Sequence, residues 1–119
     1  MKSALGLCCA TALASSLITL AVSRAASLPV QVKLENAKVK VSEAVYPPGA
    51  PRERFTRPTD EVIVFLDDCK YRRTDSQTGE TTVRERKSGE VIWHNKGEDA
   101  PVLENLGERP YRTLVIELK

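Results

Sequence analysis

The chain has 119 residues, with 18 lysines and arginines against 16 aspartates and glutamates, 41% hydrophobic residues and 5% aromatic residues. This length suits one small domain and excludes a multidomain enzyme, and the composition disfavours collagen-like, coiled-coil and intrinsically disordered chains. Much of the apolar content lies in the first two dozen residues, so we expect the folded part to have a thin core.

The first segment has the pattern of a secretory signal peptide. Lys2 gives a positive start, residues 4–22 are uncharged and mostly apolar, and the small residues Ser23 and Ala25 are spaced as a cleavage site requires. We expect cleavage after Ala25, with cleavage after Ser23 or Ala26, or an uncleaved membrane anchor, as alternatives. Residues 1–25 are therefore predicted to be a signal peptide, residues 26–119 one domain, and the protein periplasmic or secreted.

The charge balance of the remaining chain argues against two classes of partner. Removal of residues 1–25 takes away Lys2 and Arg24 and no acid, which leaves a formal net charge of zero. The charges are interleaved, as in the Arg-Glu-Arg-Lys run at residues 84–87, which we interpret as a solvated strand face. A nucleic-acid-binding protein has a basic excess on one face. We therefore expect no nucleic acid and, after cleavage, no membrane as partner.

Cys69 is the one cysteine outside the predicted signal peptide, so no intramolecular disulfide is expected. We interpret Cys69 as a small buried apolar residue within a strand. The alternatives are a reactive thiol and an intermolecular bridge.

The chain after the signal peptide alternates with a period of two residues, which is typical of strands. Val30, Val32 and Leu34 are expected on one strand face, and the alternation resumes at residues 39–41. Residues 46–51 contain three prolines and are expected to form a loop or an edge crossing. Residues 61–66 are apolar on both faces, which predicts a strand covered on both sides.

Turn signals then divide the rest of the chain into short segments. They occur at residues 67–68, 75–80, 88–89, 95–99 and 105–108, and they separate expected strands at residues 70–74, 81–87, 90–94 and 111–118. In residues 90–94, Trp93 alternates with Ile92 and His94, and we interpret Trp93 as a core residue. No helix pattern occurs after the signal peptide. The prediction is an all-β sandwich, barrel or jelly roll.

Five segments in this order resemble the small single-domain cupin proteins: Tyr-Pro-Pro-Gly at residues 46–49, Val-Ile-Val-Phe-Leu at 62–66, Ser-Gly-Glu-Val-Ile-Trp at 88–93, Glu-Asn-Leu-Gly-Glu-Arg-Pro-Tyr-Arg at 104–112, and Ile-Glu-Leu-Lys at 116–119. The likeness runs from about residue 39 to the end and implies a single small RmlC-like jelly roll, or cupin-like β-barrel.

The resemblance also implies a metal ion held by a His-x-His pair, a carboxylate and a further histidine. In this chain the His-x-His positions fall on Phe55 and Arg57, and neither side chain can ligate a cation. The carboxylate would be Asp60 or Glu61. We therefore expect a member degenerate at the ligand positions, with no metal cofactor and no assigned enzyme activity. The alternative is a metal-dependent, oxygenase-type cupin enzyme with a nonstandard ligand set of Glu61, His94, Asp99 and Glu104.

The expected binding site is the barrel interior. Arg57, helped by Arg52 or Arg54, would hold a small anionic molecule by charge-assisted hydrogen bonds. The alternative is a structural module in which Arg57 forms an internal ion pair with Glu61 or Glu104. The predicted interior residues are Phe55, Arg57, Glu61, Phe65, Trp93, Glu104 and Tyr111.

A third hypothesis is a protein-interaction module, since cupin-like barrels often dimerise by pairing edge strands. Residues 30–41 are a plausible exposed strand for a homodimer.

Overall fold

The structure is a computed structural model that describes residues 28–119; the predicted signal peptide lies outside the described residues. The described chain forms ten strands and no helix, which confirms the all-β class. No helix long and apolar enough to cross a membrane occurs in this part of the chain. The strands are β1 (Val30–Glu35), β2 (Val39–Tyr46), β3 (Phe55–Thr56), β4 (Asp60–Phe65), β5 (Cys69–Thr74), β6 (Thr81–Arg86), β7 (Val91–His94), β8 (Asp99–Ala100), β9 (Val102–Asn105) and β10 (Tyr111–Leu118).

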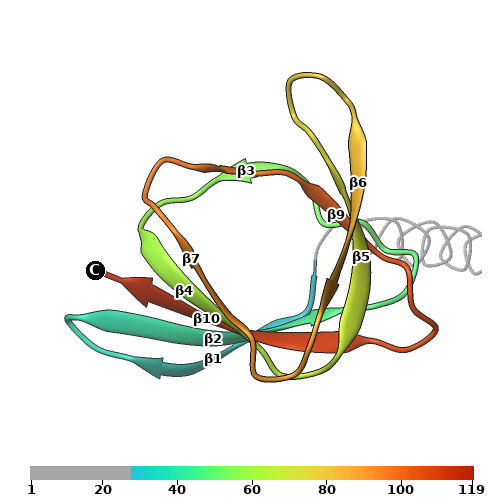
Figure 1. Ribbon diagram of the computed structural model, residues 1–119. Coiled ribbons are helices and arrows are strands. Elements are labelled where there is room, and N and C mark those ends of the chain that lie inside the picture. The colour runs from blue at the N-terminus through green and yellow to red at the C-terminus, as the bar shows by residue number, and fades with distance from the viewer. Residues whose placement is uncertain (1–27) are drawn as a thin grey trace, which may run out of the picture.

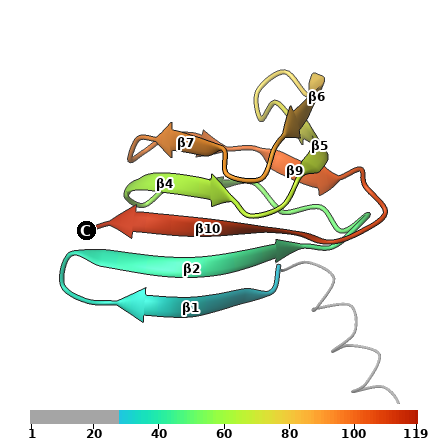
Figure 2. The same cartoon turned by 60° about the horizontal axis from the view of Figure 1, so that its bottom comes forward.

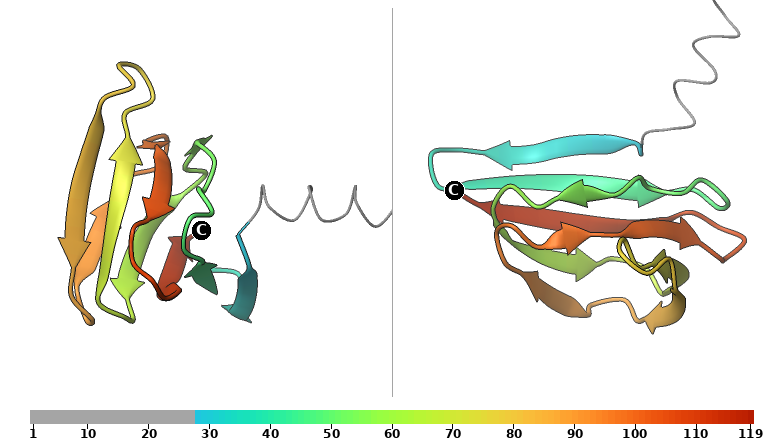
Figure 3. Two further views of the ribbon diagram at one scale, coloured as in Figure 1. Left: turned by 90° about the vertical axis from the view of Figure 1, so that its right-hand side faces the viewer. Right: turned by 90° about the horizontal axis from the view of Figure 1, so that it is seen from above.

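The strands form three antiparallel sheets, with the orders β1-β2-β10-β4-β7, β6-β5-β9 and β3-β8. They are arranged around a common interior in Figure 1, and β1 forms one edge of the five-stranded sheet in Figure 2. The views of Figure 3 place β1 and β6 at opposite sides of the molecule. The expected jelly roll is present, but the expected closed barrel is wrong, because the hydrogen-bonded ladders end at sheet edges and do not form a ring.

The five-stranded sheet turns alternate residues toward the interior. On β2 these are Ser42, Ala44 and Tyr46, all buried, and on β4 they are Glu61, Ile63 and Phe65. The outward residues Val62 and Val64 are only partly buried. Residues 61–66 are therefore less covered on the outer side than expected.

A β-bulge interrupts the alternation of β1. Val32 pairs with Ser42, but Leu34 pairs with Val41, so the register shifts between these two positions. Directly paired residues share a face of a sheet, and Ser42 and Val41 lie on opposite faces of β2. Leu34 therefore does not share a face with Val30 and Val32, and the expectation that all three point the same way is wrong. The extra residue of a bulge causes such a change of face.

The core is thin and rich in tyrosine. Its buried cluster is Ala44, Tyr46, Ile63, Phe65, Tyr71 and Tyr111. The rings of Tyr46 and Tyr111 stack with centroids 4.6 Å apart, and Tyr71 links this pair to Phe65. Burial of these rings is the main apolar contribution to stability. Offset stacking lets such large rings fill the narrow space between two small sheets.

Short polar motifs set the connections. In the hairpin between β5 and β6, the Asp75 carboxylate accepts hydrogen bonds from the backbone amides of Gln77 and Thr78, and Gly79 has a φ of 75°. A positive φ suits glycine because it has no Cβ. The Asn105 side chain donates to the carbonyls of Tyr46 and Arg109 and accepts from the backbone amide of Gly107, so it satisfies backbone groups of the turn.

Candidate functional site

A cavity of about 360 Å³ lies between the five-stranded and three-stranded sheets, within the size range of small-molecule sites. Its base is apolar and contains rings of the core, including Phe65, Tyr71 and Tyr111. Five arginines also line it: Arg52, Arg57, Arg73, Arg84 and Arg86. Two acids, Glu98 and Asp99, line it as well, so the cations outnumber the acids and the field favours an anion.

Two of the five arginines have acidic partners. Arg57 precedes β4 and donates to the Glu61 carboxylate, and both side chains are buried. Arg86, at the end of β6, donates from Nε to the Tyr71 hydroxyl at 3.3 Å and from Nη1 to Glu90 at 3.5 Å. Its guanidinium also lies 5.6 Å from the centre of the Phe65 ring. These two arginines are fixed in place and their charges are largely balanced.

The other three arginines have no ion pair with any residue in 28–119. Arg52 donates to two neutral oxygens, the Tyr46 hydroxyl and the Pro101 carbonyl. Arg73 and Arg84 make no side-chain hydrogen bond or ion pair to the described chain, and they extend from β5 and β6 toward the cavity. The positive charge of the cavity therefore comes mainly from Arg52, Arg73 and Arg84.

Three buried polar atoms at the cavity have no hydrogen-bond partner within the described chain: Arg52 Nε, Arg57 Nε and Thr113 Oγ1. Buried polar atoms are almost always paired with protein, water or a ligand. Two of these atoms are guanidinium N–H donors, and such donors suit an anionic or oxygen-rich ligand.

The positive charge of the cavity affects the pKa of His94. His94 lies on β7, opposite Glu61, and its Nδ1 is 3.7 Å from a Glu98 carboxylate oxygen. Burial lowers the pKa of His94 from its ordinary value of 6.5, and the charges of Arg57, Arg52 and Arg73 lower it further, against the raising effect of Glu98. The imidazole is therefore more often neutral than in water.

The structure places four predicted site residues at the interior. Arg57 and Glu61 form the buried pair described above, and Phe65 and Tyr111 belong to the aromatic base. Burial raises the pKa of Tyr111, so this hydroxyl stays protonated. Of the two expected arrangements for Arg57, the structure contains the ion pair with Glu61.

Phe55 does not line the arginine-rich cavity. It is 39% exposed and covers the guanidinium groups of Arg52 and Arg57 at 5.1 and 5.6 Å from the ring centre. It borders a separate hollow between residues 52–58 and the inner face of the five-stranded sheet. Phe55 was expected to form a wall of the interior site with Arg57 and Glu61; it borders this second hollow with them but not the arginine-rich cavity, because β3 is a two-residue strand paired with β8.

The prediction that Trp93 is a core residue is wrong. Trp93 pairs with Val62 across β4 and β7, on the face opposite Glu61, Ile63 and His94. The side chain is 50% exposed, and its indole Nε1 donates to Asn95. Trp93 is therefore not a core residue, and it borders the cavity only from its rim. β7 is the edge strand of the sheet.

Glu104 lies on the outer face of the three-stranded sheet. It pairs across β9 and β5 with Arg72, and the two side chains form an exposed ion pair of 3.1 Å. Leu103, the residue before it, lines the cavity instead. The expected interior position of Glu104 is wrong by one step of the strand alternation.

Sequence reasoning missed Arg73, Arg84 and Arg86. The run at residues 84–87 was expected to be a solvated face, and Arg84, Glu85 and Lys87 are exposed, but Arg84 and Arg86 also line the cavity. Arg84 and Arg86 are two residues apart, as are Tyr71 and Arg73, so each pair lies on one strand face. This spacing was the sequence signal that could have indicated a shared arginine face. The sequence pattern alone does not say which face is the inner one.

The residues present do not fit the metal site that the family resemblance implies. Glu61 is engaged by Arg57, whose charge would repel a cation there, and Glu104 lies on the outer face. Asp99 is held by Arg54 and by the Ser76 hydroxyl. Within residues 28–119, no group of three or more His, Cys, Asp or Glu side chains is placed to hold a metal ion.

Cys69 packs against the core cluster and is partly buried. Burial raises the pKa of its thiol to about 11. Since the thiolate is the reactive form, the side chain has the character of a small apolar residue rather than a nucleophile.

Solved structures that resemble this chain have the cupin fold. No family model and no curated protein matches the chain. A solved cupin domain from Bordetella pertussis Tohama I superposes with a TM-score of 0.69 at 19% identity, over 79% of this chain and 95% of that one. An RmlC-like cupin with a double-stranded β-helix fold from Methanocaldococcus jannaschii has a TM-score of 0.60 at 12% identity, over 77% and 80% of the two chains. The DMSP lyase DddQ from Ruegeria pomeroyi DSS-3 has a TM-score of 0.58 at 14% identity, over 77% of this chain and 47% of the lyase.

Proposed function

We propose, from the premise that this chain has the cupin fold, that it is an exported binding protein for a small organic anion. Proteins of this fold include an enzyme, but a fold does not define an activity, and the proposal depends on the cavity. The observation that carries it is the set of five arginines around one space of about 360 Å³, three of them without an acidic partner among residues 28–119.

The position of the cavity supports a binding role. It occupies the interior between the two larger sheets, where aromatic rings supply apolar contact and guanidinium groups supply charge. An anion there would satisfy unpaired donors such as Arg52 Nε and would offset the mutual repulsion of the arginines.

The direct test measures anion binding to the purified chain. A panel of inorganic phosphate, sulfate, aliphatic dicarboxylates, aryl carboxylates and aryl phosphates is screened by thermal unfolding, and hits are measured by titration calorimetry. We expect a rise in melting temperature with some of the organic anions and a weaker effect at high salt. Absence of binding across the panel, at concentrations up to the millimolar range, contradicts the proposal.

The absence of a metal cofactor stays a prediction. Elemental analysis of the chain, purified without a metal-affinity tag and before and after loading, tests it. We expect no stoichiometric metal. Near-stoichiometric iron, manganese, nickel or zinc would favour the metal-dependent enzyme and would direct mutagenesis to Glu61, His94 and Asp99.

Export also stays a prediction and rests on residues 1–25. Mass spectrometry of the chain recovered from the periplasm of an expressing bacterium tests it. We expect a chain that begins at Ala26, whereas a chain that retains Met1 and stays with the membrane fraction supports the anchor.

The homodimer likewise stays a prediction. All six residues of β1 are exposed, and β1 is an edge strand carrying Val30, Val32 and Leu34. An exposed apolar edge can pair with another strand. Sedimentation equilibrium tests this, and a monomer at all accessible concentrations contradicts it.

A further inference from the structure

Arg73 and Arg84 lie close together on one face of the β5–β6 hairpin. In the strand register Tyr71 is opposite Arg84, and Arg73 is opposite Thr82. Arg84 is therefore a diagonal neighbour of Arg73, at a typical separation of about 7–8 Å. Both side chains line the cavity, so two guanidinium groups can converge on one bound group.

The acids near this pair are engaged elsewhere. Asp99 is bound by Arg54 at 2.5 Å and by the Ser76 hydroxyl. Asp75 accepts two backbone hydrogen bonds in its own turn. Glu98 also lines the cavity but lies against His94 and the amide of Asn95.

The outward-facing arginine of the same strand is arranged differently. Arg72, between Tyr71 and Arg73, forms an ion pair with Glu104. The described chain thus balances the outer arginine of β5 and leaves the two inner ones unbalanced. Two like charges repel each other, and a bound group with two negative charges would offset that repulsion.

Flat apolar surface lies beside the pair. Tyr71 is directly opposite Arg84, and its ring stacks with Phe65 at a centroid distance of 6.4 Å and an interplanar angle of 5°. Ile92 and Leu103 also line this part of the cavity. A planar apolar body can pack here while its charged group reaches Arg73 and Arg84.

We propose that Arg73 and Arg84 together bind a dianionic group, of the phosphate-ester or dicarboxylate kind, on a ligand whose planar apolar body packs against Tyr71 and Phe65. The inference rests on the proposed anion-binding function and specifies its ligand class and its charge-recognising residues. Arg57 does not bind the dianion, because Glu61 already balances its charge.

Titration calorimetry at pH 8 with three probes tests the ligand class. Phenyl phosphate is a dianion at this pH, since the second pKa of phosphate esters is about 6. Benzoate has the same ring with one negative charge, and inorganic phosphate has the charge without the ring. We expect phenyl phosphate to bind at least about tenfold more tightly than either of the other probes.

Single substitutions at the two arginines test the assignment. Arg73→Gln and Arg84→Gln should each weaken phenyl phosphate binding by about tenfold or more, and should bring it close to that of benzoate. Arg72→Gln is the matched control, because it removes an equal charge from the same strand on the outer face, and it should leave the affinity unchanged. Without ligand, Arg84→Gln should melt no lower than the unsubstituted chain.

The outcomes separate this inference from the proposed function. If the unsubstituted chain binds an organic anion of the wider panel but does not prefer phenyl phosphate over benzoate, the ligand class is wrong while anion binding stands. If phenyl phosphate binds equally to Arg73→Gln, Arg84→Gln and Arg72→Gln, the assignment of the two arginines is wrong. If no anion of the panel binds, the proposed function fails as well.

Discussion

Arg57 and Glu61 form an ion pair whose side chains are only 4% and 3% exposed. It joins the segment before β4 to the start of β4, at the place where the family resemblance implies metal ligands. Removal of one partner from a buried pair leaves an uncompensated charge in a site of low polarity. We therefore expect Arg57→Met to lower the free energy of unfolding by about 3–5 kcal/mol in urea titrations.

The double variant Arg57→Met/Glu61→Leu should recover most of that loss, because it removes both charges and keeps similar volume. Arg72→Met is the matched control for the exposed pair with Glu104 and should cost about 0–1 kcal/mol. A loss for Arg57→Met no larger than that of Arg72→Met would show that the buried pair does not stabilise the fold.

The order of the larger strands could be predicted from the sequence because each has period-two alternation and is bounded by turn residues. Residues 61–66 and 111–118 correspond to β4 and β10 almost residue for residue. The bulge in β1 could not be predicted, since one extra residue leaves no compositional signal. The two-residue strands β3 and β8 are too short to show any period.

The candidate site was harder to predict than the fold. Arg57, Glu61, Phe65 and Tyr111 follow from the resemblance and lie at the interior. For Glu104 the strand was expected but the facing was wrong, because alternation gives two faces and does not identify the inner one. Trp93 was expected in the core for the same reason, but it is half exposed and only borders the cavity. The contact of Arg84 with the cavity, which it makes while exposed to solvent, was missed for the same reason.

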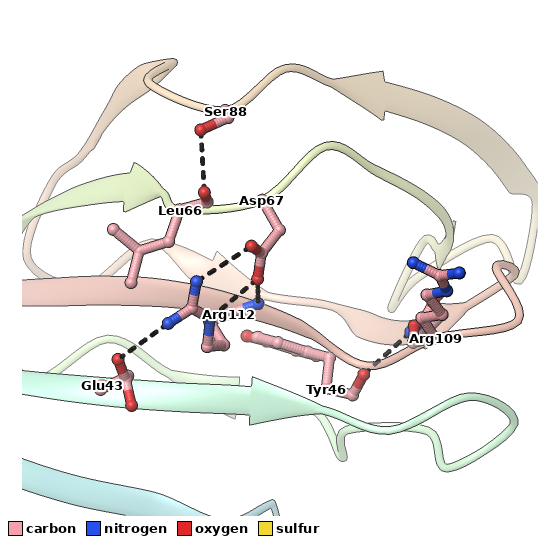
Figure 4. Close-up of polar contacts among 8 residues, drawn as sticks. Glu43, Tyr46, Leu66, Asp67, Ser88, Arg109 and Arg112 are labelled. Atoms are coloured by element: carbon pink, nitrogen blue, oxygen red, sulfur yellow. Dashed lines mark hydrogen bonds and ion pairs between the residues drawn. The ribbon is translucent and has the colours of Figure 1, made fainter.

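Asp67 and Arg112 form a clamp on the outside of the molecule. The Arg112 side chain donates from Nε at 2.9 Å and from Nη2 at 3.0 Å, and its backbone amide donates to the same carboxylate at 3.0 Å. Figure 4 shows the guanidinium between Asp67 and Glu43. The Arg112 side-chain hydrogen bonds lower the pKa of Asp67 from its ordinary 3.8, against a smaller opposing effect of burial.

A depressed carboxyl pKa stabilises the fold above the unfolded pKa, and this stability is lost as the pH falls through the folded pKa. Part of the acid unfolding below about pH 4 should therefore come from Asp67. Asp67→Asn should be less stable than the unsubstituted chain at pH 7, and the difference should narrow as the pH falls to 2. A constant difference across that range would contradict the linkage.

His94 should make stability depend on pH in the mildly acidic range. Its pKa is lowered by burial first and by the Arg57 charge second, so the unfolded chain binds a proton more readily than the folded one below pH 6.5. Stability then rises with pH through the interval between the folded pKa and 6.5 and is complete above it. His94 is the only histidine of the chain, and His94→Gln should flatten the slope of melting temperature against pH between 7 and 5. An unchanged slope would assign it to another group.

Trp93 is the only tryptophan of the chain and lies on the outer face of β7. Because half of its surface is exposed, we expect fluorescence emission close to that of tryptophan in water and ready quenching by acrylamide. Trp93→Phe should leave the affinity for phenyl phosphate unchanged, since Trp93 only borders the cavity rim from the outer face of β7, whereas Tyr71→Ala should weaken it by removing an aromatic contact surface. Blue-shifted emission that resists acrylamide would place the indole in a buried environment, and loss of affinity in Trp93→Phe would make it a wall of the site.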